Sequence, residues 1–521
     1  MPSSATFAEV PRPRSRPAKK RSSGTANYDL PPLPSLLTQP LGLEGWTALE
    51  PVLLAALASE EPLLLIGPHG SAKSFLLERL ARALGLEFRF YNASLINYDD
   101  LVGVPIPSAD RKRLEYISTP SAIWESEVVF FDEINRTRPE LQNKLFPIVH
   151  ERRVQGIPLE RLRYRWSAMN PPPAADGADD ETEVYLGAEP LDPALADRFA
   201  YLILVPGWQQ LTDAERRRIL RDQFEGEHSF RLPLAALVSR AKSRLRDLQA
   251  AAPRQLEDYL LTLMAQLEQG KLRFSARRAT MFHRNILAVH AARETLYEVA
   301  FPAIPPGVAD WSTSAVLALQ NSLPQAANGH LPEAATLLAA HRHAWRISQL
   351  DADNPWRELL SIQDPLKRCI AGVRIGEKID DSYLSQLVLD AVAAQHDPSR
   401  RKAVALAIYA TVHRARNLQA TVFETLAQEL RFILQPAEHR HSPEDCPRSR
   451  YRQVQEVCGE LVAQGRDNNS LRNRYANNLL QGLLPDGFEE CTPRQVRNLF
   501  CSVWNELAGE ADDVPGKEVG R

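Results

Sequence analysis

The chain has 521 residues, enough for roughly two to four domains, and its 44% hydrophobic and 24% charged residues are ordinary for a globular protein. A net charge of −3 provides no general attraction to nucleic acid or to an anionic membrane. The sequence has no apolar run near the ~20 residues that a membrane-spanning helix needs, and its N-terminus lacks the apolar stretch of a secretory signal.

The cysteines favour a reducing compartment, because none of the five forms a C-x-x-C pair. We therefore expect free thiols and a cytoplasmic location. His439, His441 and Cys446 lie close together, but they lack the paired spacing that is typical of a metal site.

The first 28 residues are predicted to be a disordered basic arm, because they are rich in Pro, Ser, Arg and Lys. Within residues 12–21 six basic side chains occur, and Glu9 is the acidic residue that opposes them. Such an arm fits contact with nucleic acid or an acidic partner, and it equally fits a solvated tail.

Residues 62–74, PLLLIGPHGSAKS, are the most informative stretch of the chain. The apolar run 62–66 predicts a buried parallel strand, and the segment after Lys73 predicts an amphipathic helix that stops at Gly85. The glycine turn between them presents backbone N–H groups and a helix N-terminus, which suit an anionic triphosphate. The predicted phosphate-binding residues are Gly67, Pro68, His69, Gly70, Ser71, Ala72, Lys73 and Ser74.

Two side chains of this loop have expected roles. Lys73 would neutralise the β- and γ-phosphates, and the hydroxyl of Ser74 would be a ligand of Mg²⁺. The pattern G-x-x-x-x-G-K-[ST] has Ala72 in place of its last glycine. Because a methyl group is small, we expect the loop to close provided that Ala72 has a negative φ.

A second chemical motif follows the next predicted elements. Residues 86–94 predict a strand, and 96–126 predict an inserted hairpin or short helix before a connecting helix. The apolar run 128–131 predicts another buried strand, and it ends in Asp132 and Glu133. Ligands bind at the carboxyl ends of parallel strands. We expect Asp132 to hold Mg²⁺ and Glu133 to act as general base on the attacking water.

The next segment supplies a polar residue at a strand end. Thr137 and Glu140 form a capping box for a helix that Pro147 is expected to kink or shorten. Residues 154–163 predict a hairpin, and RYRWSAMN predicts a strand that closes with Asn170. An amide at this place could position the attacking water. The alternative is a turn-forming Asn before three prolines.

The α/β part ends with a short helix at 192–198, which carries Arg198, and a strand at 201–205. Strands that alternate with helices predict a doubly wound α/β fold with a parallel sheet of about five strands. Beyond it the periodicity is helical only. The predicted parts of the chain are a basic arm at 1–28, the α/β nucleotide-binding domain at 29–206, a helical lid at 207–300, a Pro-rich linker at 301–325, an all-α region at 326–510 and a frayed tail at 511–521.

Several segments resemble the AAA+ ATPases and, within them, the MoxR family. DEINR with the following helix and HERRV resembles the second nucleotide motif, AMNP resembles the first sensor, and EPLDPALADRF resembles the segment with the arginine finger. GPHGSAKS is most similar to the regulatory ATPase variant (RavA) branch. The related McrB and NorQ/CbbQ-type ATPases share much of this pattern. The resemblance covers roughly residues 40–300 and implies a P-loop AAA+ core followed by a helical lid.

The resemblance also implies roles for arginines. Arg198 matches the arginine finger, which reaches the γ-phosphate bound by a neighbouring subunit; the alternative is a surface ion pair with Asp192 or Asp197. Arg277, or its neighbour Arg278, in FSARRA matches the sensor 2 arginine, and the sequence does not decide between them. We assign Arg277 to catalysis and Arg278 to nucleotide binding. The alternative is two exposed helix arginines. Asp132 with Glu133 matches Walker B, and Asn170 matches sensor 1.

The implied function is an ATP- and Mg²⁺-dependent hydrolase that forms a ring, by default a hexamer, and remodels a protein partner as a chaperone does. MoxR relatives typically work with a von Willebrand factor A-type partner. Hydrolysis would rotate the lid against the sheet. The segments 100–118 and 153–163 match pore-lining features, and Arg152 could face a neighbouring subunit.

Two other functions stay open. One is a nucleic-acid-directed NTPase motor like the McrB branch, which uses GTP and a nuclease partner. The basic arm and the arginines near the 153–163 hairpin favour it slightly, and the net charge of −3 and the lack of a DNA-binding signature disfavour it. The other is a nucleotide-gated scaffold with little turnover, against which Glu133 and Arg198 argue.

Overall fold

The computed structural model describes residues 30–110, 114–117, 119–172, 190–221, 232–270, 272–351, 353–412, 416–431, 433, 447–464, 471–484, 488 and 490–508. The chain divides into two compact units, one that ends at Trp345 and one that begins at Arg346. The predicted basic arm, the predicted tail and the group of His439, His441 and Cys446 lie outside the described residues.

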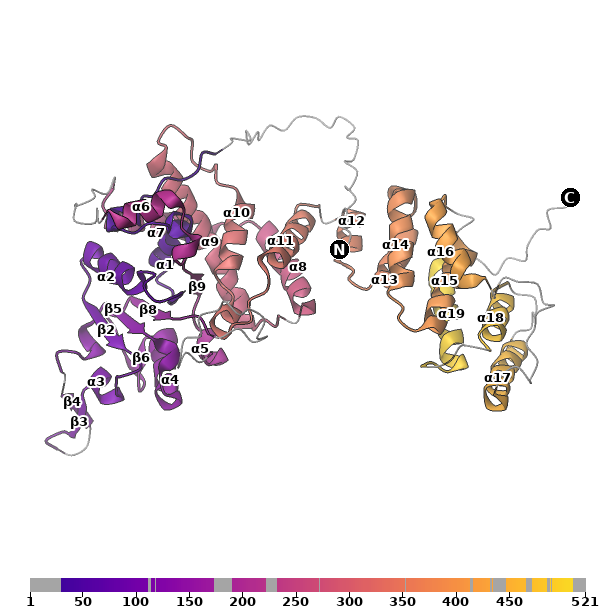
Figure 1. The fold of residues 1–521 in the computed structure, drawn as a ribbon, viewed down its shortest axis with the longest axis horizontal. Helices are drawn as coiled ribbons and strands as arrows, with labels where there is room; N and C mark the ends of the chain where they lie inside the picture. The colour runs from indigo at the N-terminus through magenta and orange to yellow at the C-terminus, as the bar shows by residue number, and fades with distance from the viewer. Residues whose placement is uncertain are drawn as a thin grey trace. The chain divides into compact units, whose positions relative to one another are not determined.

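A five-stranded parallel sheet forms the centre of the first unit (Figure 1), which confirms the predicted α/β class. Its order is β2 (Phe88–Asn92), β5 (Val128–Asp132), β8 (Tyr164–Met169), β1 (Leu63–Ile66) and β9 (Tyr201–Leu204). The register pairs Leu63 with both Trp166 and Tyr201. Because these strands are parallel, the carboxyl ends of β1, β5 and β8 meet at one edge of the sheet, and the phosphate loop follows β1 there.

The two faces of the sheet bury alternate side chains of each strand. Leu63, Leu65 and Phe130 belong to the core of one face, and Leu64 and Phe131 to the core of the other. The first face carries α1 (Glu50–Ser59), α2 (Lys73–Leu84), α7 (Leu234–Ala250) and α9 (Ala276–Ala300), and the second carries α3 (Tyr98–Val102), α4 (Pro139–Phe146) and α5 (Pro193–Ala196).

Two antiparallel hairpins interrupt the α/β order. One consists of β3 (Val104–Pro107) and β4 (Leu114–Ile117), and the other of β6 (Arg153–Val154) and β7 (Ile157–Pro158). Before the second hairpin, α4 ends at Phe146 and a single π-helical turn begins at Pro147. Proline lacks the N–H of a helix interior, so the helix stops here as predicted.

The longer helices after the sheet share the core of its first face. In α10 (Trp311–Gln320), Ala315, Ala318 and Leu319 are fully buried, and the helix packs on α9. The prediction of a Pro-rich linker at 301–325 is therefore wrong, because α10 lies inside that segment. The separation of 29–206 from 207–300 as two domains stays a prediction. The other elements here are α6 (Asp213–Leu220), α8 (Gln255–Gln269), η8 (Pro324–Asn328) and α11 (Ala334–Ser348).

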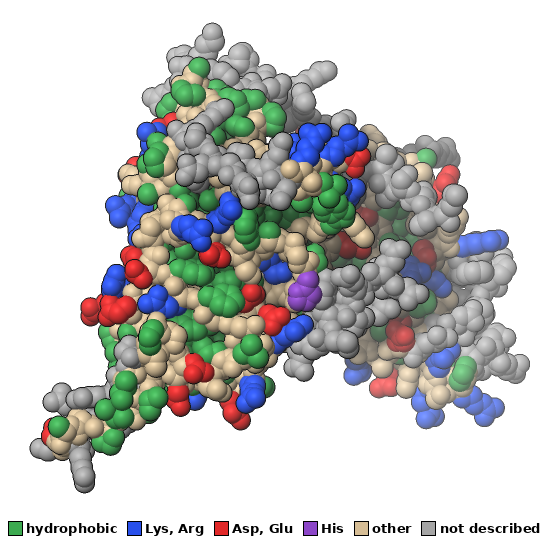
Figure 2. All heavy atoms as spheres, turned by 60° about the vertical axis from the view of Figure 1, so that its left-hand side comes forward, with side chains coloured by type: hydrophobic (Ala, Val, Ile, Leu, Met, Phe, Trp, Pro, Cys, Tyr) green, Lys and Arg blue, Asp and Glu red, His purple; other side chains and the backbone are tan. Residues whose placement is uncertain are grey.

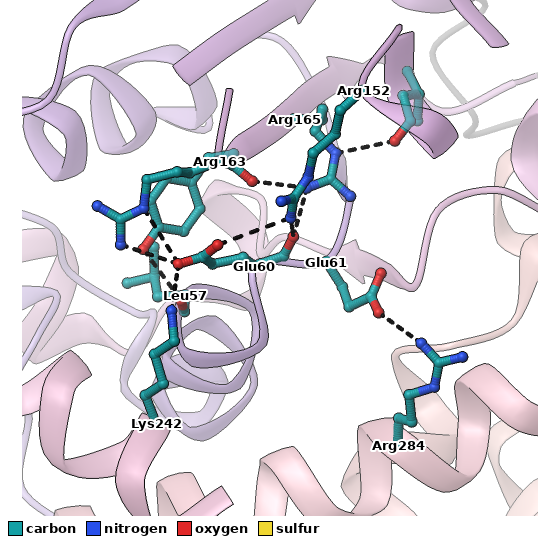
Figure 3. Close-up of polar contacts among 10 residues, drawn as sticks. Leu57, Glu60, Glu61, Arg152, Arg163, Arg165, Lys242 and Arg284 are labelled. Atoms are coloured by element: carbon teal, nitrogen blue, oxygen red, sulfur yellow. Dashed lines mark hydrogen bonds and ion pairs between the residues drawn. The ribbon is translucent and has the colours of Figure 1, made fainter. Parts of the chain in front are cut away.

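Two adjacent glutamates tie these helices to the edge at which the strands begin (Figure 3). Glu60 Oε1 accepts from Lys242 Nζ of α7 at 2.6 Å and from Arg163 Nη2 at 3.0 Å, and Glu61 pairs with Arg284 of α9 at 3.2 Å. Burial raises the pKa of Glu60, but Lys242 and Arg163 outweigh it and hold that pKa below its ordinary value. Ion pairs thus supplement the apolar contacts between α7, α9 and the sheet.

Arg165 of β8 completes the same cluster from inside the sheet. Its guanidinium donates to the carbonyls of Val149 at 3.0 Å, Glu60 at 2.6 Å and Arg163 at 2.7 Å. Burial, together with the nearby charge of Arg152, lowers the pKa of Arg165 to about 9. Arg152 Nη2 also donates to the Glu60 carbonyl, at 3.2 Å (Figure 3). Arg152 therefore contacts its own chain, which does not support the prediction that it faces a neighbouring subunit.

The second unit is helical in its described residues. Its core is centred on α15 and α19, where Val404, Leu406 and Phe500 are fully buried. Its helices are α12 (Pro355–Ser361), α13 (Pro365–Ile375), α14 (Asp381–Ala393), α15 (Pro398–Val412), α16 (Ala420–Leu430), α17 (Arg448–Gln464), α18 (Leu471–Gly482) and α19 (Pro493–Ala508). None of the helices in the described ranges is long and apolar enough to cross a bilayer.

Candidate nucleotide site

A cavity of about 290 Å³ lies at the carboxyl edge of the sheet, beside the phosphate loop. It brings together predicted residues from the loop, from the end of β5 and from the end of β8. The lining residues are His69, Gly70, Ser71, Ala72, Lys73, Ser74, Phe75, Asn92, Asp132, Glu133, Met169 and Asn170. With Asn92 at the end of β2, four separate segments thus contribute charged and polar groups to one hollow.

Lys73 begins α2 and is 8% exposed. Its Nζ donates to the carbonyls of Gly67 at 2.7 Å and Pro68 at 2.9 Å, so the loop curls around the ammonium. Burial lowers the pKa of Lys73 to about 8, although Asp132 and Glu133 act in the opposite direction. The ammonium therefore lies in the loop at the place where phosphate oxygens would bind.

Ser74 and Asp132 form the most direct link between the loop and β5. Ser74 Oγ donates to Asp132 Oδ2 at 2.8 Å, and Asp132 Oδ1 accepts from the N–H of Glu133 at 2.9 Å. A hydroxyl and a carboxylate side by side at the end of a strand are oxygen ligands that Mg²⁺ accepts. These two residues fit the predicted magnesium site.

The loop conformation corrects one expectation. Ala72 has φ +62°, not the negative value that we assumed, and it precedes α2 in the left-handed region. An L-residue pays an energetic cost there, of about 1 kcal/mol. Gly67 has a different constraint, because a Cβ at this position would lie 2.1 Å from Val205 Cγ2. The loop thus needs Gly67 for space and tolerates alanine at 72 under strain.

Glu133 is held at the cavity wall by its neighbours. Its carboxylate accepts from Ser94 Oγ at 3.3 Å and pairs with Arg136 Nη1 at 3.5 Å. Its backbone also has a positive φ, of 53°. The residue that we predicted as general base is therefore in the cavity but engaged with two side chains.

Asn170 follows β8 directly and is buried. Its Nδ2 lies 3.0 Å from His69 Nε2, and its Oδ1 accepts from Lys73 Nζ at 3.5 Å. The Asn170 amide thus contacts two residues of the phosphate loop. An asparagine that only formed the turn before the three prolines would not need these contacts.

A second cavity, of about 520 Å³, adjoins the first, and sequence reasoning missed it. It shares Gly70, Ser71, Ala72 and Phe75 with the first cavity. Apolar side chains from the segments 42–46 and 206–219 complete its lining. Its other lining residues are Gly42, Leu43, Glu44, Trp46, Arg79, Pro206, Trp208, Leu211 and Ile219. An apolar hollow beside a phosphate site suits the base of a nucleotide. The residues come from separate segments without a motif, so no local signal in the sequence pointed to them.

Arg198 and Arg277 lie outside the lining of either cavity but close to one another. Arg198 packs over the ring of Phe146 at 4.4 Å and donates to the carbonyl of Ala194. Burial, and then the charge of Arg277, lowers the pKa of Arg198. Arg277 pairs with Asp197 at 3.8 Å. The two predicted catalytic arginines form one cationic cluster.

Arg278 does not meet its prediction as a nucleotide-binding residue. Its side chain is buried, with 1% of the residue exposed, and its guanidinium is enclosed by backbone carbonyls and by Asp197. Burial lowers its pKa, against the opposing effect of Asp197. All its donors have partners inside the fold, so none is free for a phosphate.

Comparison with known proteins supports part of this picture. Residues 62–199 match the model of the AAA domain, dynein-related subfamily. An uncharacterized protein of Staphylococcus epidermidis is 27% identical over 143 residues; these are 26% of this chain and 52% of that protein, so the chain matches about half the length of its curated relative.

A solved structure, of a candidate ATPase from Cytophaga hutchinsonii, is 20% identical and covers 50% of this chain and 83% of its own, with a TM-score of 0.36. That score is too low for an inference about shared structure. The family match over residues 62–199 indicates an AAA domain, and it does not single out the RavA-like branch.

Proposed function

We propose that this chain, whose residues 62–199 match the AAA domain, hydrolyses ATP and uses the reaction to remodel a protein partner. The observation that supports this most is the convergence of Lys73, Ser74, Asp132, Glu133 and Asn170 on one cavity. A cation, a hydroxyl, two carboxylates and an amide at the carboxyl edge of a parallel sheet are the groups that phosphoryl transfer to water requires.

Binding would place the phosphates in the 290 Å³ cavity and the base in the 520 Å³ cavity. Lys73 would exchange the carbonyls of Gly67 and Pro68 for phosphate oxygens. Mg²⁺, held by Ser74 and Asp132, would supply positive charge that offsets the charge of the phosphates.

The chemical step would depend on Glu133 and Asn170. Glu133 would accept a proton from the attacking water, and Asn170 would orient that water. Since Ser94 and Arg136 hold the Glu133 carboxylate in this structure, Glu133 must give up at least one of these contacts before it can take the proton.

The arginines support hydrolysis between subunits. Arg198 and Arg277 lie near each other but do not line the cavity of their own chain. Asp197, which pairs with Arg277, offsets one of the two guanidinium charges, so the two arginines can attract a further anion. We propose that this anion is the γ-phosphate bound by a neighbouring subunit, in a ring that is a hexamer by default.

An exposed apolar hairpin supports a protein as the partner. Val104, Ile106 and Ile117 on β3 and β4 are 51%, 37% and 54% exposed, and Figure 2 shows apolar side chains on the projection at its lower left. Membership of the MoxR family, a von Willebrand factor A-type partner, chaperone action and a cytoplasmic location belong to the same proposal.

The nucleic-acid alternative has less support. Of the arginines near the second hairpin, Arg161 pairs with Glu125 at 2.9 Å and Arg163 pairs with Glu60 at 3.0 Å. Both side chains thus already have a carboxylate partner within the chain. The basic arm lies outside the described residues and remains as the argument for nucleic acid.

The test is hydrolysis by the purified chain and by Lys73→Ala and Glu133→Gln. We expect loss of ATP hydrolysis in both, loss of nucleotide binding with Lys73→Ala, and retained binding with Glu133→Gln. Glu268→Gln, at an exposed glutamate of α8, is the matched control and should behave as the wild type.

Further measurements separate the alternatives. Hydrolysis of GTP that is faster than that of ATP and is stimulated by DNA would favour the McrB-like motor. Tight ATP binding with negligible turnover in the wild type would favour the scaffold. Full hydrolysis in both folded site variants would contradict the motor proposal.

A further inference from the structure

Arg278 of α9 makes five hydrogen bonds, which is as many as a guanidinium has N–H groups. Nε donates to Asp197 Oδ1 at 3.2 Å, and Nη2 donates to the carbonyls of Asp197 at 2.8 Å and Ala196 at 3.4 Å. Nη1 donates to the carbonyls of Phe199 at 2.9 Å and Ser322 at 3.1 Å. Every donor of a buried cation is therefore used within the fold.

These acceptors lie on both sides of Arg198. The carbonyls of Ala196 and Asp197 precede it, and that of Phe199 follows it. The next carbonyl, of Ala200, accepts from Asn285 Nδ2 of α9 at 2.8 Å. Helix α9 thus holds the backbone of the loop that carries Arg198 on either side of that residue.

The same contacts join the loop to the start of α9. Ser275 Oγ donates to Asp197 Oδ2 at 3.2 Å and accepts the N–H of Arg278 at 3.0 Å as the cap of the helix. Arg277, the next residue along, pairs with Asp197. The position of Arg277 is therefore coupled to the loop as well.

We propose that Arg278 is a positioning residue: it fixes the loop at 196–200 so that Arg198, with Arg277 beside it, meets the nucleotide of the neighbouring subunit. This inference rests on the proposed function. A planar fork with five donors can satisfy carbonyls in several directions at once, which a lysine with its single nitrogen cannot do equally well. This explains an arginine at a buried position beside the exposed Arg277.

The first test is the steady-state kinetics of Arg278→Gln. We expect kcat to fall by about 10- to 100-fold, because a misplacement of about 1 Å can cost as much, while KM for ATP changes less than about threefold. Lys73 and the cavity lining are untouched, so nucleotide binding should persist. Arg278→Lys retains part of the hydrogen bonding and should recover part of kcat.

The matched control is Arg293→Gln. Arg293 lies on the same helix, is 5% exposed, and likewise donates to a backbone carbonyl, that of Asp310, and to Ser314 Oγ at 2.8 Å. It does not contact the loop at 196–200. A comparable loss of stability with unchanged kcat in this variant would separate positioning from general destabilisation.

The decisive test mixes two variant subunits, each with impaired hydrolysis. Glu133→Gln has a defective nucleotide site but an intact Arg198 loop, and Arg278→Gln has the reverse. In a mixed ring, the intact nucleotide site of an Arg278→Gln subunit can face the intact Arg198 loop of a Glu133→Gln subunit. All the catalytic groups are present at such an interface, so mixing should restore hydrolysis. The same experiment with Arg198→Ala in place of Arg278→Gln tests the proposed function itself.

The outcomes distinguish the two proposals. If Arg198→Ala is not complemented, hydrolysis between subunits is wrong. If Arg198→Ala is complemented but folded Arg278→Gln is not, the positioning role is wrong. Should Arg278→Gln fail to fold, Asp197→Asn decides: this side chain is 24% exposed and supplies the acceptor for Nε. Failure of complementation by folded Asp197→Asn, or unchanged kcat in it, would overturn the inference.

Discussion

At the scale of single residues, the nucleotide site contains two non-glycine residues with a positive φ, Ala72 at 62° and Glu133 at 53°. Such conformations are sparsely populated and persist where the surrounding structure enforces them. Both residues line the same cavity, and both lie at the end of a strand or the start of a helix. The strain is therefore concentrated at the place where the phosphates and the attacking water would bind.

Substitutions at Ala72 test this strain. Ala72→Gly should raise the free energy of unfolding by up to about 1 kcal/mol, since glycine relieves the left-handed cost of alanine but gains entropy in the unfolded chain. Ala72→Val should lower it, because a β-branched residue tolerates positive φ poorly. Urea unfolding measures both. A clear loss of stability with glycine would contradict the strain.

Lys73 should give the nucleotide site a basic limit in pH. Its pKa of about 8 means that the ammonium loses its charge as pH rises through that value. We expect kcat/KM, which reports the free enzyme, to fall about tenfold per pH unit above pH ~8.

The control for this profile is Lys73→Arg, because a guanidinium does not titrate in the range. Its residual kcat/KM should be flat between pH 7 and pH 9, as an approximate range. A wild-type profile that is equally flat there would contradict the assignment of Lys73 as the titrating group.

At the scale of elements, α7 and α9 share one apolar core with the sheet and are also tied to it through Glu60 and Glu61. We expected hydrolysis to rotate a lid against the sheet. A shared core and ion pairs resist such a rotation, so we now expect these helices to move together with the sheet of their own chain.

Glu60→Gln tests the strength of this tie. The pKa of Glu60 in the folded chain lies below its ordinary value of 4.5. The carboxylate therefore stabilises the fold above pH 4.5, and this stabilisation is lost as pH falls through the folded pKa. We expect the free energy of unfolding of the variant at pH 7 to be about 2 kcal/mol lower than that of the wild type. The difference from the wild type should vanish in acid.

The control is Glu87→Gln, because Glu87 is exposed and pairs with Arg89 at 3.6 Å. An exposed pair contributes about 0–1 kcal/mol. Equal losses in both variants at pH 7, or a Glu60→Gln deficit that persists at acidic pH, would show that Glu60 does not tie α7 to the sheet.

At the scale of the whole molecule, the chain has two units with separate cores, one centred on the sheet and one on α15 and α19. The nucleotide site lies wholly within the first. We therefore expect calorimetry of the full chain to show two unfolding transitions. A non-hydrolysable ATP analogue at 100 times its Kd should stabilise one of them by about 2.7 kcal/mol and leave the other unchanged. A single transition that shifts as a whole would contradict the division.

The sequence by itself determined the α/β class, the strands and the loop-and-carboxylate set of the candidate site. Continuous apolar runs identify buried strands, and functional groups that directly follow such runs must lie at one edge of a parallel sheet. Gly67, Lys73, Asp132 and Asn170 could be predicted for this reason, because their positions depend on local pattern and strand order.

Only the tertiary structure decided the rest, since it depends on contacts between segments far apart in the chain. The left-handed φ of Ala72, the apolar cavity between Trp46 and Trp208, and the burial of α10 have no local signature. The same holds for the neighbours Arg277 and Arg278. Both are arginines near a helix start, and packing alone leaves one half-exposed in a cationic cluster and encloses the other against the loop of Arg198.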